Sequence, residues 1–411
     1  MIKNILHKIF PSELGRGAFI LFVMINIFNI LNFLFHFVMG RILGPSDYGI
    51  LAVLMSLIYV YGTPSEAIQN LVAKYSSKLN VERNYGKIKF FMYKSLKKGF
   101  SISLVVFVLA TIITFVLSKF LEINFWLIFI TNVAIFFSIF SPIIRGVLQG
   151  RKKFTFLGGS MILEATFKLF FSMSLVLFGF KVFGAITGVL IGFFTGLIFA
   201  FYFNKDIIDS KKEENSFKGI YFQSFPYFAT MFAIILFFSL DIIFARRFFS
   251  PELAGQYAVV SMLGKIIFLG TIAVSKAMFP LTSEKKEKKE DSFKLFRKSF
   301  IIVFVLCTIG VILYTIFPKI IISILYGKQY LEMYPYLVYS GLAFSFLSLS
   351  NLVFIYGLSI NRLKRTYLLS IFVIIEVVMF FLFHNNILEY ILAFMVSNIT
   401  MFIGSLFFIK R

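Results

Sequence analysis

One short stretch of the sequence occurs twice. Residues 41–53 read RILGPSDYGILAV, residues 247–259 read RFFSPELAGQYAV, and both follow a long apolar run. The two stretches align without gaps and share an Arg, a Pro, a Gly, an Ala and a Val. A proline presets a turn and a glycine relieves crowding, so both predict a sharp turn between two helices. Repetition of this turn indicates a chain built from two similar halves.

A second, weaker repeat supports the same division. Residues 151–156 (RKKFTF) resemble residues 362–367 (RLKRTY), at nearly the same separation. Both repeats join positions on the same side of the expected membrane, which predicts a parallel repeat with six spans per copy. We therefore expect two lobes, 1–205 and 206–411, related by a pseudo-twofold axis along the membrane normal. Lobes of this kind can rock against each other, as they do in transporters.

The composition places most of the chain in lipid. Of the 411 residues, 59% are hydrophobic, only 15% are charged, and Phe alone accounts for 59. A soluble domain is roughly 45–50% apolar and about 25% charged. A soluble chain of this length could not bury so much apolar surface, because its surface-to-volume ratio fixes how much faces water. A soluble enzyme, a secreted disulfide scaffold and a disordered protein are excluded.

Apolar runs of about 20 residues predict membrane-spanning helices. Their length argues against β-barrel strands, which need only about 10 residues. We expect an all-α polytopic membrane protein with about twelve transmembrane helices in two parallel six-helix bundles. The predicted spans are 18–39, 49–73, 99–118, 123–148, 156–179, 182–203, 222–245, 253–281, 299–318, 334–358, 366–384 and 388–409.

The net charge of +22 comes from 41 Lys and Arg against 19 Asp and Glu. Most of the basic residues fall at the chain ends and in the connections after even-numbered spans, which predicts that both termini are cytoplasmic. We infer that these basic residues orient the chain in the membrane and interact with anionic lipids, and we expect no nucleic-acid partner. Residues 87–98 alternate Lys with apolar residues and predict an interfacial amphipathic helix. The expected location is the cytoplasmic membrane, with a multi-pass topology.

The sequence carries no signature of a metal site. Cys307 is the single cysteine, so neither an internal disulfide nor a cysteine-based metal site is expected. His7, His36 and His384 lie far apart in the sequence and lack the spacing of a metal-binding motif. We expect no metal and no cofactor, with H⁺ or Na⁺ as the possible coupling ion.

Several motifs occur in a characteristic order along the chain. They are residues 40–49 after the first span, 145–150 at the end of the fourth, 240–241 in the seventh, the turn 251–257, and 278–281 at the end of the eighth. Together they resemble the Wzx-type oligosaccharide and polysaccharide flippases, within the multidrug/oligosaccharidyl-lipid/polysaccharide exporter superfamily. The resemblance covers essentially the whole chain. It implies a MATE-like fold and the passage of a polyprenyl-linked glycan across the membrane.

Ionisable residues inside the spans are the main candidates for function. At the bilayer centre such a group costs about 2.5–3.5 kcal/mol on insertion scales, so it indicates a polar chamber or a partner. The candidates for binding substrate phosphate or acidic sugars are the cations Lys168, Lys265 and Arg145. The candidates for ion coupling are the carboxylates Glu66, which follows a predicted helix break at Pro64, Glu164 and Asp241.

These choices leave structural alternatives open. Glu164 and Lys168 are four residues apart and share a helix face, so they could form a mutually neutralising pair. Lys265 and Lys276 are also predicted to share a face, but Lys276 lies near the cytoplasmic end, where it can reach water. Asp241 could pair with a nearby arginine.

A polar stripe is expected on the first span. Asn26, Asn29, Asn32 and His36 fall within a sector of about 120° when a helix turns by 100° per residue. Such a stripe can bind sugar hydroxyls along a chamber wall, or it can join neighbouring helices through hydrogen bonds. We favour the first interpretation and include these residues in the substrate site.

The sequence as a whole predicts a flippase that moves a lipid-linked oligosaccharide or polysaccharide precursor by alternating access and acts as a monomer. The alternative is a MATE-type cation-coupled multidrug exporter, which requires a buried acid without cationic neighbours; Glu66 and Glu376 are its candidates. A membrane enzyme such as a sugar polymerase is disfavoured. The short outer loops hold no carboxylate pair or histidine cluster, and no catalytic residue is predicted.

Overall fold

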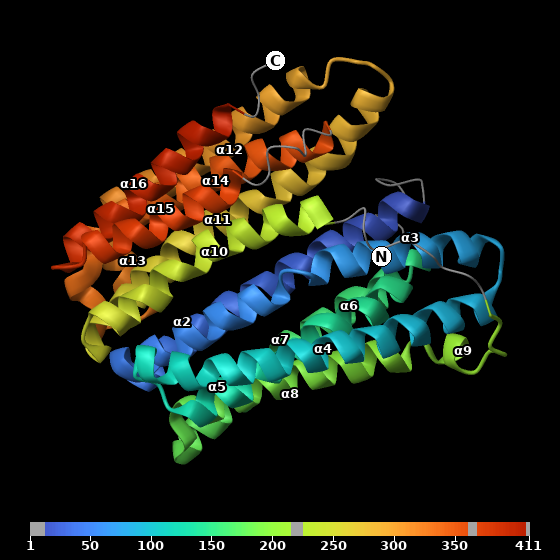
Figure 1. Cartoon of the computed structure of the whole chain (residues 1–411), viewed down its shortest axis with the longest axis horizontal. Coiled ribbons are helices and arrows are strands. Elements are labelled where there is room, and N and C mark those ends of the chain that lie inside the picture. Colours follow the sequence, from blue (N-terminus) through green and yellow to red (C-terminus); the bar gives the residue numbers. More distant parts are fainter. Residues whose placement is uncertain (1–12, 215–224, 361–367, 408–411) are drawn as a thin grey trace, which may run out of the picture. The chain divides into compact units, whose positions relative to one another are not determined.

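The computed structural model describes residues 13–214, 225–360 and 368–407. Within these ranges the chain is helical and contains no strand (Figure 1). The repeated stretch at 362–367 lies outside the described residues, as do His7 and the first basic residues that were used to predict the orientation.

The helices follow one another with short connections. The first group is α2 (Glu13–Gly62), α3 (Ser65–Val81), α4 (Tyr85–Leu121), α5 (Phe125–Asn132), α6 (Ala134–Gly150), α7 (Phe154–Leu175), the π-helical η1 (Val176–Phe180), α8 (Lys181–Tyr202) and α9 (Lys205–Ile208). The second group is α10 (Phe225–Phe248), α11 (Pro251–Glu287), α12 (Phe293–Ile316), α13 (Pro318–Leu325), the 3-10 helix η3 (Lys328–Tyr336), α14 (Leu337–Ser359), α15 (Leu368–Leu382) and α16 (Ile387–Leu406).

The apolar helices confirm the predicted membrane fold. Nine helical segments in the described ranges are long and apolar enough to cross a membrane. Two of them contain a break at a glycine with positive φ, Gly44 in α2 (74°) and Gly179 between α7 and α8 (91°). Dividing these two, and adding the shorter apolar helix Leu369–Leu382, gives the twelve predicted spans. The chain is an all-α polytopic membrane protein.

Contacts divide the chain into two compact units. The first unit comprises Met1–Leu43 and Tyr61–Phe222, and the second comprises Gly44–Val60 and Gln223–Arg411. The half of α2 that follows the break at Gly44 therefore belongs with the later helices. The predicted halves, 1–205 and 206–411, describe the sequence repeat and stay a prediction.

In the first unit, one apolar core joins α3, α4 and α6. Val72, Phe91 and Ile144 are among its buried side chains, and Ile207 of α9 closes one end of it. Beside this core α7 packs on α8 through small residues. A Cβ on Gly192 of α8 would lie only 2.7 Å from the Cβ of Lys168, so a larger residue would push the helices apart. This close approach fixes α7, which carries Glu164 and Lys168.

In the second unit, the two repeated turns contact each other. A Cβ on Gly49 would lie 2.8 Å from Cα of Gly255 and 3.5 Å from the carbonyl oxygen of Pro251. A Cβ on Gly255 would overlap the carbonyl of Pro45. Pro45 corresponds to Pro251 in the repeat, and Gly49 corresponds to Gly255. Each glycine thus packs against the other copy's proline, as a pseudo-twofold relation requires.

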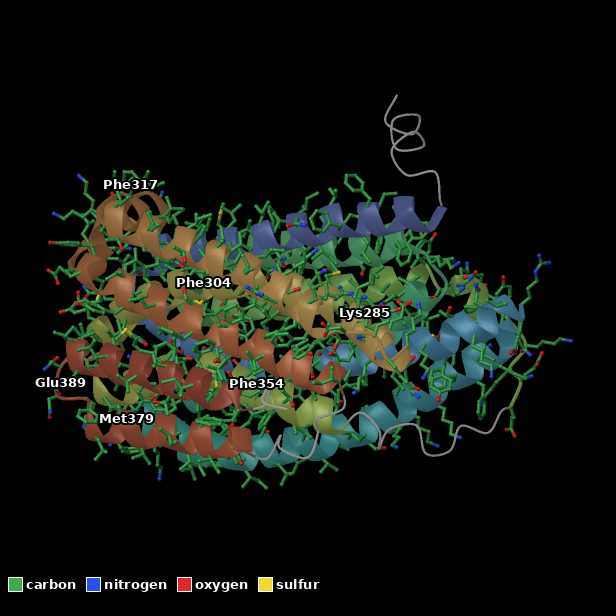
Figure 2. The ribbon with its side chains drawn as sticks, turned by 90° about the horizontal axis from the view of Figure 1, so that it is seen from above. Lys285, Phe304, Phe317, Phe354, Met379 and Glu389 are labelled. Carbon is green, nitrogen blue, oxygen red and sulfur yellow. The ribbon has the colours of Figure 1, made fainter. Side chains whose placement is uncertain are left out.

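The outer surface of the second unit has the apolar character of a lipid-facing surface. Figure 2 shows Phe317 and Glu389 at one end of this unit and Lys285 toward the other end. Between these ends α12 exposes a series of large apolar side chains that includes Ile301, Phe304 and Ile312. Water-exposed patches of this kind are rare in soluble proteins, so the surface fits contact with lipid tails.

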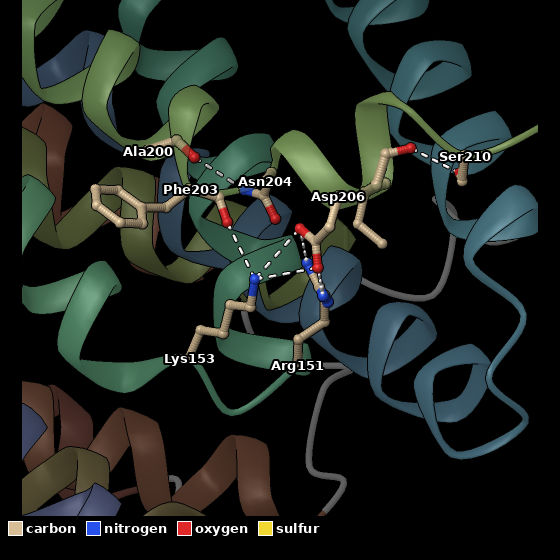
Figure 3. Close-up of polar contacts among 8 residues, drawn as sticks. Arg151, Lys153, Ala200, Phe203, Asn204, Asp206 and Ser210 are labelled. Carbon is tan, nitrogen blue, oxygen red and sulfur yellow. Dashed lines mark hydrogen bonds and ion pairs between the residues drawn. The ribbon is translucent and has the colours of Figure 1, made fainter.

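The segment after α8 is held by a cluster of ion pairs (Figure 3). Arg151 and Lys153, from the connection between α6 and α7, both bind the carboxylate of Asp206 in α9; Nη1 of Arg151 lies 3.0 Å from Oδ1 and Nζ of Lys153 lies 3.2 Å from Oδ2. Lys153 also donates to the carbonyl of Phe203 (3.2 Å). Burial opposes ionisation of Asp206, but Arg151, assisted by Lys153, lowers its pKa to about 2.

The Asp206 cluster predicts an acid-sensitive contribution to stability. Because the pKa lies below the ordinary value of about 3.9, the carboxylate stabilises the fold above about pH 4, and this contribution is lost as the pH falls through about 2. The side chain is partly exposed, so we expect no more than about 1 kcal/mol. Asp206→Asn should lower the melting temperature in detergent at pH 7 and much less at pH 2, where about half of the carboxylate is already protonated.

The matched control is Asp209→Asn, whose carboxylate is exposed and forms no ion pair with the described residues. It should melt as the unaltered protein does at both pH values. An equal loss of stability at pH 7 and pH 2 for Asp206→Asn would contradict the assigned role.

The glycine contact between the repeated turns predicts a steric effect. Gly255→Ala should lower the free energy of unfolding by about 1–3 kcal/mol, because the added methyl overlaps Pro45. Gly270→Ala is the control on the same helix, since a Cβ there meets nothing within 4 Å. It should leave stability unchanged or raise it slightly, as alanine favours helix. Thermal unfolding of the detergent-purified variants measures both; equal stability would rule out the tight contact.

Candidate functional site

Arg145 of α6 is buried and binds α7 through three contacts. Its Nε donates to Oγ of Ser160 (2.9 Å), and its Nη2 donates to the carbonyl of Ser160 (3.1 Å) and to Oε2 of Glu164 (2.8 Å). Glu164 is also buried. The glutamate is therefore paired with Arg145 and not with Lys168, the partner that helix spacing allowed. The ion pair and the further hydrogen bonds offset the free-energy cost of removing both charges from water.

Lys168 lies one turn beyond Glu164 on α7 and is also buried. Its ammonium group donates a hydrogen bond to Oδ1 of Asn32 in α2 and lies 4.5 Å from the centre of the Phe35 ring. In the described ranges it forms no ion pair. An amide oxygen and an aromatic face stabilise a cation without cancelling its charge. Arg145, Glu164 and Lys168 together thus leave one surplus positive charge in the first unit.

Only part of the polar stripe predicted on the first span lies near Lys168. Asn32 binds Lys168, and His36 is buried one helical turn further along. Asn29 is exposed, and the exposed Asn26 donates its amide to the carbonyl of Phe22 in its own helix (2.8 Å). The structure therefore divides the stripe into Asn32, which binds Lys168, the buried His36, and two exposed asparagines.

Glu66 lies in the first turn of α3. The helix begins at Ser65, directly after Pro64, and the preceding helix ends at Gly62, so a helix break does occur where the proline predicted one. A carboxylate in the first turn is favoured by the helix dipole. Glu66 is half-buried. Its position fits a structural role at the start of the helix, and the coupling role stays a prediction.

In the second unit, Asp241 of α10 and Lys265 of α11 form a fully buried ion pair. Nζ of Lys265 lies 3.4 Å from Oδ1 of Asp241, while Oδ2 accepts hydrogen bonds from the hydroxyls of Ser261 and Tyr257, the latter at 3.2 Å. Tyr390 of α16 donates to the backbone carbonyl of Asp241 at 2.5 Å. Asp241 is therefore bound by a lysine and three hydroxyls; the expected arginine is not its ion-pair partner.

The ammonium group of Lys265 also faces aromatic rings. It lies 4.8 Å from the centre of the Phe238 ring and 5.7 Å from that of Phe344. Lys276, which the spacing placed on the same face, is exposed, whereas Lys265 is completely buried. The two lysines therefore have different surroundings despite their spacing along α11.

Glu376 of α15 completes the group in the second unit. It is completely buried, and neither carboxylate oxygen has a hydrogen-bond partner among the described residues. Asp241 and Lys265 both lie within range of electrostatic interaction with it. Asp241, Lys265 and Glu376 together leave one surplus negative charge when both acids are ionised. In the described ranges no three His, Cys, Asp or Glu side chains come together as a metal site would require.

Sequence reasoning placed Glu376 inside the membrane but left it out of the flippase site, because no partner is visible from the sequence. Its neighbours come from α10 and α11, more than a hundred residues earlier. Tyr257 entered the sequence analysis only as the end of the turn 251–257, and Tyr390 gave no signal, since tyrosine is common in this chain. Only the packed helices reveal that their hydroxyls meet at Asp241.

The comparisons with known proteins agree with this fold. A family model described as polysaccharide biosynthesis protein matches residues 14–286. An uncharacterized membrane protein of Methanocaldococcus jannaschii is 25% identical over 280 residues, which is 62% of this chain and 64% of that protein. The alignment therefore spans less than two thirds of that relative.

Solved transporter structures resemble the chain over nearly its whole length. An inward-facing multidrug resistance MATE family transporter of the MOP superfamily matches with a TM-score of 0.76 and 11% identity, over 94% of this chain and 97% of that one. The lipid II flippase MurJ in an inward closed conformation matches with a TM-score of 0.66 and 14% identity, over 95% and 87%. The MATE multidrug transporter DinF-BH matches with a TM-score of 0.66 and 14% identity, over 97% and 95%.

These similarities to solved structures confirm the predicted MATE-like fold. The family model matches residues 14–286, well over half of the 411-residue chain, from the first span into α11. On that match, the chain belongs to the polysaccharide biosynthesis protein family.

Proposed function

We propose that the chain is a flippase that moves a polyprenyl-phosphate- or diphosphate-linked oligosaccharide across the cytoplasmic membrane, with both termini in the cytoplasm. The observation that carries this proposal is Lys168, a buried cation whose hydrogen-bond and ring partners are uncharged. A buried ammonium group attracts an anion more strongly than an exposed one does, because the dielectric constant of the interior is low. Phosphate is the anion that a lipid-linked sugar supplies.

The neighbours of Lys168 suit the remainder of such a substrate. The amide oxygen of Asn32 accepts its hydrogen bond from Lys168 and can accept one from a sugar hydroxyl instead when Lys168 turns to a phosphate. Arg145 keeps Glu164 away from Lys168 and so preserves the positive charge. In this account Arg145 is a positioning residue, and Asn26, Asn29 and His36 extend the polar surface of the first span. The lipid tail remains in the bilayer while the two lobes expose the substrate alternately.

We assign ion coupling to the second unit. The surplus negative charge of Asp241, Lys265 and Glu376 is neutralised when a proton or a sodium ion binds there. Because Lys265 is paired with Asp241 and completely buried, we place it in the coupling group and no longer with the phosphate ligands. Glu164 is less suited to coupling, since Arg145 already neutralises it. Glu66 remains a second coupling candidate.

Export of cationic drugs is the second candidate function. The buried carboxylate of Glu376 favours it, because an unpartnered acid can bind a cation. The nearby ammonium of Lys265 opposes it, since a cationic drug would meet a fixed positive charge. Drug-resistance assays in an efflux-deficient host distinguish the two functions: resistance conferred by this chain would favour the exporter.

Lys168 provides the most direct mutational test. Lys168→Gln should reduce polysaccharide export about 10- to 100-fold, the loss expected when a hydrogen bond to a charged group is removed. Lys168→Arg should retain part of the activity because the charge remains. Export is measured in cells that depend on this chain for polysaccharide output, with protein levels matched. The control is Lys276→Gln on exposed Lys276, which should export normally.

Normal export by Lys168→Gln would remove this lysine from the mechanism. Normal export by the double variant Lys168→Gln, Lys265→Gln would reject a charge-based site altogether.

Glu376 tests the coupling assignment. Glu376→Gln keeps the shape of the side chain but removes the surplus negative charge, so downhill flipping should continue while acceleration by an imposed proton or sodium gradient is lost. Flipping by purified protein in vesicles, with and without each gradient, measures this effect. Glu389→Gln, which alters a half-buried carboxylate at the start of α16 that binds Asn385 and Asn386, should stay gradient-dependent. A gradient response in Glu376→Gln equal to that of the unaltered protein would contradict the assignment.

A further inference from the structure

The segment that follows α8 folds back onto the beginning of α4. The Asp206 cluster holds its start, as Figure 3 shows. Further along, the carbonyl of Ser210 accepts a hydrogen bond from Nζ of Lys89 (2.9 Å), and the backbone N–H of Glu213 donates to the carbonyl of Gly86 (3.2 Å). These contacts place residues 209–214 beside the first turns of α4, more than a hundred residues away in the sequence.

This arrangement brings two lysines to one aromatic ring. Nζ of Lys94 and Nζ of Lys212 each lie 5.3 Å from the centre of the Phe90 ring, so the two ammonium groups lie within twice that distance of each other. Both side chains are exposed, and neither forms an ion pair with a carboxylate in the described ranges. The ring stabilises each cation, but the two cations repel each other.

The sequence around this pair adds further positive charge. Residues 85–98 contain five lysines and no acidic residue. Of these, Lys97 is exposed on the turn that follows Lys94. The patch formed by Lys94, Lys212 and Phe90 is therefore a site where an anion would reduce repulsion. No carboxylate of the described residues forms an ion pair with either lysine, although Glu213 and Glu214 follow Lys212 in the sequence.

The depth of the patch relative to the membrane identifies the anion. Two turns beyond Lys94, α4 enters its apolar part, where large side chains such as Ile102, Val105 and Leu109 are exposed. Exposed apolar residues of a spanning helix contact lipid tails, so lysines just before them lie at the level of the headgroups. The exposed ring of Tyr93 beside Lys94 suits the same interfacial depth.

We propose that Lys94 and Lys212, bridged by Phe90, form a binding site for the phosphate of an anionic phospholipid. The bound headgroup, which carries one negative charge, offsets half of the charge of the pair and ties residues 209–214 to α4. The site is independent of the proposed substrate site, because it lies at the surface of the first unit and uses none of the residues assigned to flipping. Its ligand is a resident membrane lipid.

The test uses the full chain purified in neutral detergent and titrated with dioleoyl phosphatidylglycerol, dioleoyl phosphatidylcholine or inorganic phosphate. Thermal unfolding and native mass spectrometry report binding. Phosphatidylglycerol should give a saturable rise in melting temperature and retained lipid adducts, and phosphatidylcholine should give neither. The double variant Lys94→Gln, Lys212→Gln should bind phosphatidylglycerol about thirtyfold more weakly, since each lysine near an anionic surface contributes about fivefold.

The matched control is Lys97→Gln, Lys205→Gln, which removes the same charge from exposed lysines of the same region that do not contact Phe90. It should keep most of the affinity. Gel filtration verifies that both double variants are folded, and any destabilised variant is replaced by Lys212→Gln alone. Equal affinities of the two double variants would overturn the site. Saturation by inorganic phosphate at the same concentration as phosphatidylglycerol would overturn its assignment to lipid.

Discussion

Inside a bilayer a charged side chain needs a partner, and the ion pair between Arg145 and Glu164 decides which charge of the first unit is left over. Arg145 also binds Ser160 through its side-chain hydroxyl and its carbonyl, so the pair fixes α6 against α7. With Glu164 occupied, Lys168 has only Asn32 and an aromatic ring as partners. The Arg145–Glu164 pair therefore leaves Lys168 as the cation of this group without a carboxylate partner among the described residues.

The clusters of buried charge described in the two units carry opposite surplus charges. Arg145, Lys168 and Glu164 in the first unit are two cations and one carboxylate. In the second unit, Asp241 and Glu376 around Lys265 are two carboxylates and one cation, and this unit also buries Arg246 outside the group. In the function that we propose, these opposite surpluses serve different ligands: an anionic phosphate at the first group and a small cation at the second. A chain made of two similar halves can acquire two roles in this way while the fold of each half stays the same.

Much of the fold was predictable because lipid imposes a simple rule: apolar runs of sufficient length become helices. The repeat at 41–53 and 247–259 also predicted related turns, and the structure adds that Gly49 and Gly255 touch. Pairing of the buried charges was less predictable. Helix spacing placed Glu164 beside Lys168, but the arginine that binds it comes from another helix. The partners of Asp241 come from α11 and α16, and those contacts depend on packing that no local pattern encodes.

The central claim is that this chain moves a lipid-linked glycan. The most direct measurement reconstitutes the purified protein in vesicles that carry a fluorescent polyprenyl-diphosphate oligosaccharide in one leaflet. A membrane-impermeant glycosidase then reports how much reaches the other leaflet. Our account predicts protein-dependent transfer of the glycolipid and no transfer of the cationic dye rhodamine 6G. Transfer of the dye with no transfer of the glycolipid would contradict it.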